Sequence, residues 1–172
     1  WWWHPHNAVD ASTAVSDPLA AYMRIEWNSL LPGDPASRAR VVNRSHTTDF
    51  SQLKDSDPRA QAFLMEMREQ MERATPVTSM DGEKIRISGY LVPLEYDDTH
   101  QIMEFLLVPY FGACIHTPPP PPNQIIHVFL NITPKGEFMP MDQVEIAGLM
   151  EVRVSESDMG KSAYTLWADA LT

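Results

Sequence analysis

Apolar residues in the second half of the chain follow the spacing of β-strands. Two segments alternate apolar and polar residues with a period of two, and three are short runs rich in apolar residues. Polar and glycine-containing turns separate most of them. This pattern predicts five strands, at residues 84–94, 103–110, 124–132, 144–155 and 162–171.

One helix is predicted ahead of the strands. Asp57 is a good N-cap residue, and Pro58 suits the first helical position. Apolar residues then recur at helical spacing, which predicts a helix over residues 57–73 with one apolar stripe, and we interpret its methionines as core filler. The stripe consists of Ala60, Phe63, Leu64, Met67 and Met71.

Glycines inside two of the predicted strands point to a barrel. Gly89 lies in the first strand and Gly148 in the fourth, where a glycine commonly marks a bend, a bulge or a close backbone contact. Long, bent first and fourth strands in a set of five are typical of a small closed barrel of the oligonucleotide/oligosaccharide-binding (OB) type. We therefore predict an α+β, mainly β fold: a five-stranded antiparallel OB-like barrel with one long N-terminal helix packed on it and a wrapping N-terminal extension.

The 172 residues are enough for one domain. Residues 7–20 are small and polar, residues 22–32 form a short apolar-aromatic anchor, and residues 33–56 are turn-rich and are expected to wrap the core. We divide the chain into an N-terminal tether over residues 1–21 and a single barrel domain over residues 22–172.

Composition and charge narrow the range of functions. With 44% hydrophobic residues the chain can build a real core, and a net charge of −10 argues against nucleic acid and anionic lipid as partners. No apolar run is long enough to span a membrane. No signal peptide is present, but a removed one would leave this kind of start. A single cysteine excludes an internal disulfide.

The segment GACIHTPPPPPNQ, residues 112–124, contains the strongest candidate site. Its five prolines, residues 118–122, lack backbone N–H groups and should form a polyproline rod. In an extended segment Cys114 and His116 would project from the same side. His127 is expected on the face opposite Ile126 and its apolar neighbours, and the rod could bring that histidine back toward the pair. Cysteine and histidine together suit Zn²⁺.

Other roles for these residues stay open. A lone cysteine is commonly a small buried hydrophobe. Alternatively, Cys114 is a nucleophile activated by His116 or His127, although no Lys or Arg occurs in residues 87–134 to stabilise a thiolate. The proline run is either an internal connector or a rod recognised by another protein.

The remaining polar candidates are weaker. The side-chain amides of Asn123 and Gln124 can position the loop or offer donors to a partner. His4 and His6 in the opening WWWHPHN can bind metal adventitiously, whether or not residues 1–7 are native. Acidic residues near His100 and in a later turn are most simply solvated turn residues, with a weak cation site as the alternative; they are Glu95, Asp97, Asp98, Glu156 and Asp158.

Residues 89–97, 104–128 and 25–32 together resemble a bacterial periplasmic family of unknown function. Its hallmark is the Gly-Ala-Cys-Ile-His run ahead of consecutive prolines and Asn-Gln. Members of that family are typically exported and often encoded beside a lipoprotein-export-like ABC transporter, in some cases linked to zinc limitation. The resemblance covers roughly residues 22–170 and implies a periplasmic accessory protein.

The resemblance and the motif together predict a binding protein rather than an enzyme. We expect a periplasmic Zn²⁺-binding accessory protein of an ABC transporter, with Cys114, His116 and His127 as the metal ligands. The alternative is a metal-free protein-interaction module that docks on a transporter or its partner through the proline-run loop.

Overall fold

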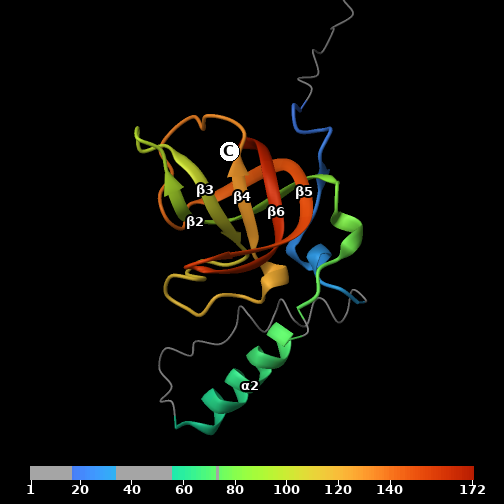
Figure 1. Cartoon of the computed structure of the whole chain (residues 1–172), viewed down its shortest axis with the longest axis vertical. Coiled ribbons are helices and arrows are strands. Elements are labelled where there is room, and N and C mark those ends of the chain that lie inside the picture. The colour runs from blue at the N-terminus through green and yellow to red at the C-terminus, as the bar shows by residue number, and fades with distance from the viewer. Residues whose placement is uncertain (1–16, 34–55, 73) are drawn as a thin grey trace, which may run out of the picture.

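The computed structural model describes residues 17–33, 56–72 and 74–172, and its centre is a closed barrel (Figure 1). The strands pair in the order β2-β3-β4-β6-β5, and β5 pairs back onto β2. All five predicted strands and the mainly β character are confirmed. The barrel strands are β2 (Lys84–Tyr96), β3 (Ile102–Val108), β4 (Ile126–Leu130), β5 (Gln143–Ser157) and β6 (Gly160–Leu171).

The barrel is mixed, so the prediction of a purely antiparallel sheet is wrong. Strands β4 and β6 are parallel, with Ile126 opposite Tyr164 and Leu130 opposite Ala168. The reason is geometric: around a closed ring with an odd number of strands, directions cannot alternate at every step. At least one neighbouring pair must be parallel, and here it is β4 with β6.

The two strand glycines allow the barrel to close, as predicted. At Gly89 strand β2 changes partner, from β5 over its first half to β3 over its second half. A Cβ atom at Gly89 would lie 2.8 Å from the Val108 carbonyl oxygen. A Cβ atom at Gly148 would lie 2.1 Å from the Trp167 carbonyl oxygen, beside a register shift between Ala147 and Gly148. Only glycine permits these close backbone approaches.

Two hydrophobic clusters lie on opposite faces of the barrel wall. Because side chains alternate along a strand, Leu91 and Leu107 point into the barrel, whereas Val92, Leu106 and Val108 point outward. The outer cluster is covered by the loop between β3 and β4. It consists of Val92, Leu106, Val108, Ala113, Ile125 and Met141.

The N-terminal segment is attached to the barrel by backbone and side-chain hydrogen bonds. Strand β1 (Met23–Arg24) pairs in parallel with β2, and the 3-10 helix η1 (Trp27–Leu30) follows it. The Tyr164 hydroxyl, inside the barrel, donates to the Leu30 carbonyl at 2.8 Å and accepts from the Val77 N–H at 2.7 Å. This arrangement matches the predicted apolar-aromatic anchor. The wrap predicted over 33–56 falls almost entirely outside the described residues.

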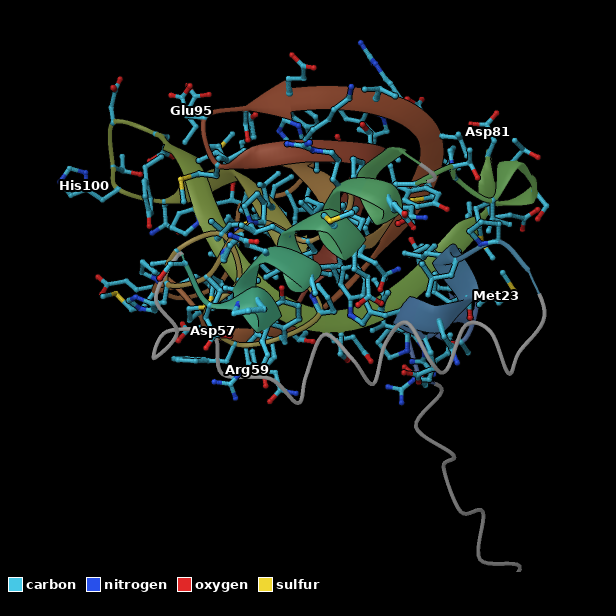
Figure 2. The ribbon with its side chains drawn as sticks, turned by 90° about the horizontal axis from the view of Figure 1, so that it is seen from below. Met23, Asp57, Arg59, Asp81, Glu95 and His100 are labelled. Carbon is cyan, nitrogen blue, oxygen red and sulfur yellow. The ribbon has the colours of Figure 1, made fainter. Side chains whose placement is uncertain are left out.

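A long helix packed on the barrel is not confirmed. The α-helix α2 (Pro58–Glu72) has 15 residues and lies beside one end of the barrel (Figures 1 and 2). Leu64 of the predicted stripe is 58% exposed, and Arg59 pairs with the Asp57 carboxylate at the helix start. Ile25 and Leu30 complete the core together with the barrel strands, and none of the described side chains of α2 is part of it. The side chains of Phe63, Met67 and Met71 lie outside the described residues.

We expect Gly148→Ala to lower the free energy of unfolding by about 3 kcal/mol, because the new methyl group would overlap the Trp167 carbonyl. Gly136→Ala is the control: its φ of +111° is unfavourable for alanine but the space around it is open, so about 1 kcal/mol is expected. Denaturant unfolding monitored by tryptophan fluorescence measures both values. Equal losses in the two variants would contradict this account of barrel closure.

Candidate functional site

The loop between β3 and β4 is a compact series of turns, not an extended segment. Gly112 and Cys114 both have left-handed backbone conformations, with φ of +89° and +65°. The Gly112 carbonyl accepts hydrogen bonds from the N–H groups of Ile115, His116 and Thr117 at 3.3, 2.8 and 3.1 Å. The extended conformation expected for the segment containing Cys114 and His116 is therefore wrong. Glycine at 112 is the sequence feature that permits this turn.

The proline run changes conformation at its last residue. Pro121 has φ −56° and ψ 151°, in the polyproline region, whereas Pro122 opens the short 3-10 helix η3 (Pro122–Gln124). The polyproline rod predicted over residues 118–122 therefore ends before Pro122. Proline is tolerated as the first residue of a helical turn because its N–H would have no partner there.

Cys114 is half-buried and packs against the outer hydrophobic cluster. Burial raises the pKa of its thiol to about 11, so the group is protonated near neutral pH. A cleft of about 390 Å³ lies between Cys114 and the β5–β6 hairpin, where Glu156, Asp158 and Lys161 line it. A protonated, apolar-packed thiol is neither a ready nucleophile nor a preformed thiolate ligand.

The two histidines of the predicted site differ in environment. His116 is exposed on the loop. His127 is only 4% exposed and lies on the outer face of β4, where its ring stacks on Phe129 with centroids 4.4 Å apart. Its Nδ1 lies 2.5 Å from Ser155 Oγ, and its Nε2 lies 2.5 Å from Glu104 Oε1. Both ring nitrogens therefore already have protein partners.

Cys114, His116 and His127 are not assembled into a metal centre in this structure. Within residues 17–33, 56–72 and 74–172, no group of three or more His, Cys, Asp or Glu side chains is arranged to hold a metal ion. His4 and His6 lie outside the described residues. Binding of zinc by the three residues stays a prediction.

Asn123 and Gln124 are buried and attach the end of the proline run to earlier parts of the chain. The Asn123 amide donates to the Thr75 carbonyl at 3.2 Å, and the Gln124 amide donates to the Trp27 carbonyl at 3.0 Å. The Trp27 indole N–H in turn donates to the Ser88 carbonyl of β2. Both amides position backbone in this structure.

Large apolar side chains are exposed on and beside the same loop. Phe111 is 66% exposed, although its ring contacts Tyr90 edge-on at a centroid distance of 6.0 Å, and Ile115 is 39% exposed. Met139, 62% exposed, lies in the neighbouring loop, which is attached to the first because the Gly112 N–H donates to Met141 Sδ. We name Phe111, Ile115 and Met139 the loop surface.

The acidic turn between β2 and β3 has a structural explanation. Asp97 accepts hydrogen bonds from the Thr99 hydroxyl at 2.7 Å and from the Gln101 N–H at 2.9 Å, and these bonds lower the pKa of its carboxyl. Figure 2 shows His100 at the outer tip of this hairpin, directed away from the barrel. The solvated-turn interpretation fits Asp97.

Sequence reasoning did not identify Glu104 and Ser155 as partners of His127. One signal was available: Glu104 is the only charged residue in the apolar run 102–110. A carboxylate in such a run requires a polar partner, and Leu106, two residues further along β3, is paired with His127. Ser155 has no comparable signal, because its contact depends on a register shift in β5.

This fold and loop define a small closed-barrel protein with an elaborated β3–β4 connection. A family model described as "Protein of unknown function (DUF3299)" matches residues 27–172, and the chain belongs to this family. A solved structure of a DUF3299 family protein from Pseudomonas aeruginosa is similar, with 28% identity and a TM-score of 0.64 over 88% of this chain and 95% of that one. No curated protein matches the sequence. No helix among the described residues is long and apolar enough to cross a membrane.

Reaction of Cys114 with iodoacetamide should be slow near pH 7 and should accelerate as the pH rises toward the thiol pKa of about 11. The physical reason is that only the thiolate reacts, and burial disfavours it. Intact-mass spectrometry over a pH series measures the rate, with the unfolded chain in guanidinium as the control. Rapid modification of the folded protein at pH 7 would contradict the burial argument.

Proposed function

We propose that the protein is a metal-free protein-interaction module that docks on a partner through the loop surface. The observation that carries this proposal is that exposed apolar side chains lie on a loop whose backbone is fixed. Buried side chains and hydrogen bonds to the barrel and the N-terminal segment fix it. Large apolar side chains exposed on neighbouring loops are a feature of interaction sites on otherwise polar proteins. Phe111 is the natural anchor, because aromatic side chains provide large contact areas at low entropic cost.

Rigidity of the loop supports docking by reducing the cost of binding. Ala113 and Ile125 are fully buried in the outer cluster, and Asn123 and Gln124 are hydrogen-bonded to backbone carbonyls. A surface already fixed in one conformation loses less entropy when a partner binds. Phe111 and Ile115 are therefore presented by a loop whose two ends are tied to the barrel.

Charge indicates the chemistry of the partner. The protein carries a net charge of −10, and residues 87–134, which include Phe111 and Ile115, contain no Lys or Arg. A partner protein with an apolar pocket bordered by basic residues would complement this surface, and opposite charges would speed the encounter. Nucleic acid is disfavoured by the same charge.

The barrel class is consistent with a binding role. A five-stranded barrel whose third and fifth strands are parallel supports assignment to the OB-like class, in which one face and its loops bind ligands. Periplasmic location and association with an ABC transporter, which the family resemblance implied, remain part of this proposal.

The docking proposal predicts that Phe111→Ser/Ile115→Ser weakens partner binding by about tenfold or more, because the apolar anchors are lost. A photo-crosslinking amino acid at position 111 in producing cells identifies the partner, and calorimetry with the purified partner measures affinity. Met103→Ser is the matched control, since Met103 is exposed at the opposite end of β3. Cys114→Ala should also bind normally. Unchanged affinity of the double variant would exclude the loop surface.

Zinc binding by Cys114, His116 and His127 is the competing proposal, and a chelator competition titration at neutral pH distinguishes the two. We expect that any zinc bound by the chain is unaffected by Cys114→Ala/His116→Ala, since His127 is already hydrogen-bonded at both nitrogens. A truncation lacking residues 1–7 is the control for His4 and His6. Stoichiometric binding that survives the truncation but is lost in the double variant would establish the zinc site instead.

A further inference from the structure

A serine, a histidine and a glutamate form a hydrogen-bonded chain on the outer face of the barrel. In the tautomer that donates from His127 Nε2 to the Glu104 carboxylate, Nδ1 is an acceptor. In the structure this Nδ1 faces the Ser155 hydroxyl at 2.5 Å. The order nucleophile, base and orienting carboxylate is the arrangement that activates a serine.

The strands explain why these three residues meet. His127 is on β4, Glu104 is on the neighbouring β3, and Ser155 is on β5, two strands away across β6. A register shift in β5 between Val152 and Ser155 directly precedes the serine. Irregularities of this kind redirect a side chain and are frequent beside active sites. Stacking of Phe129 on the imidazole holds the ring orientation.

Two further hydroxyls beside this chain have no partner among the described residues. Thr165 pairs in register with His127, and Ser162 pairs in register with Ser155. Each is only 1% exposed, and neither Oγ atom makes a hydrogen bond within the described part of the chain. Buried hydroxyls without partners cost free energy in the resting protein. The hydroxyls of Ser162 and Thr165 are therefore available as hydrogen-bond donors close to Ser155, whose own hydroxyl contacts the His127 imidazole.

We propose that Ser155 is a nucleophile for acyl esters, with His127 as its general base and Glu104 as the residue that orients and stabilises the imidazole. The Ser155 oxygen attacks the ester carbonyl while its proton moves to His127 Nδ1. The ester C–O bond breaks, the leaving alcohol takes that proton, and an acyl-Ser155 remains. Water then attacks the acyl group with His127 again as base, and the acid is released. This activity is independent of docking through the loop surface.

A fluorophosphonate probe tests the proposal on the full chain, because an activated serine displaces fluoride and keeps the phosphonyl group. We expect one adduct per chain, mapped to Ser155 by peptide mass spectrometry, and slow hydrolysis of p-nitrophenyl acetate. Ser155→Ala should abolish labelling, and His127→Gln should slow it by about 100-fold or more. Ser157→Ala is the matched control on the same strand and should label at the normal rate; its hydroxyl donates to the Gly160 carbonyl.

Thermal unfolding of each variant checks that loss of labelling is not loss of fold. If His127→Gln does not fold, Glu104→Gln replaces it and should also label more slowly. The absence of an adduct at Ser155 in the intact chain overturns the proposal, whatever the variants do. Equal labelling rates in the intact chain and in a folded His127→Gln or Glu104→Gln variant overturn it as well. Phe111→Ser/Ile115→Ser should label normally, which separates this test from the docking test.

Discussion

Closure of the barrel depends on two places where backbone approaches backbone with no room for a side chain. At Gly148 the Trp167 carbonyl occupies the space of a Cβ atom, and at Gly89 strand β2 leaves β5 and joins β3. Because β2 pairs with both β5 and β3, it closes the ring of strands. The parallel contact of β4 with β6 is the consequence of closing a ring of five strands. Both proposed sites lie on the outside of this wall.

Buried polar groups attach the N-terminal segment and the β3–β4 loop to the same framework. Tyr164, Asn123 and Gln124 all pair with backbone groups of segments far away in sequence. An unpaired buried carbonyl or N–H is costly, so these contacts select one arrangement of segments that have no sheet partners of their own. The loop can expose Phe111 and Ile115 because its ends are fixed in this way.

Cys114 and His127 illustrate how environment decides the chemistry of a residue type. The thiol is packed against apolar side chains, and burial raises its pKa to about 11, which favours the neutral form. His127 is buried more deeply but between a carboxylate and a hydroxyl, both hydrogen-bonded to its ring. The hydrogen-bonded arrangement that we propose to be reactive therefore surrounds the histidine and not the cysteine on which the motif is centred.

The local sequence pattern was sufficient to predict the strands, the helix bounds and the two glycine bends. These features depend on alternation, on capping and on the absence of a side chain, which are properties of residues close together in the sequence. It was also sufficient to place His127 opposite the interior residues of β4. Only the tertiary structure decided that the segment from Cys114 to His116 is not extended, because that depends on left-handed turns at Gly112 and Cys114. Likewise, Ser155 meets His127 only through a register shift and an intervening strand. Contacts between residues distant in sequence depend on register and closure, which no short segment encodes.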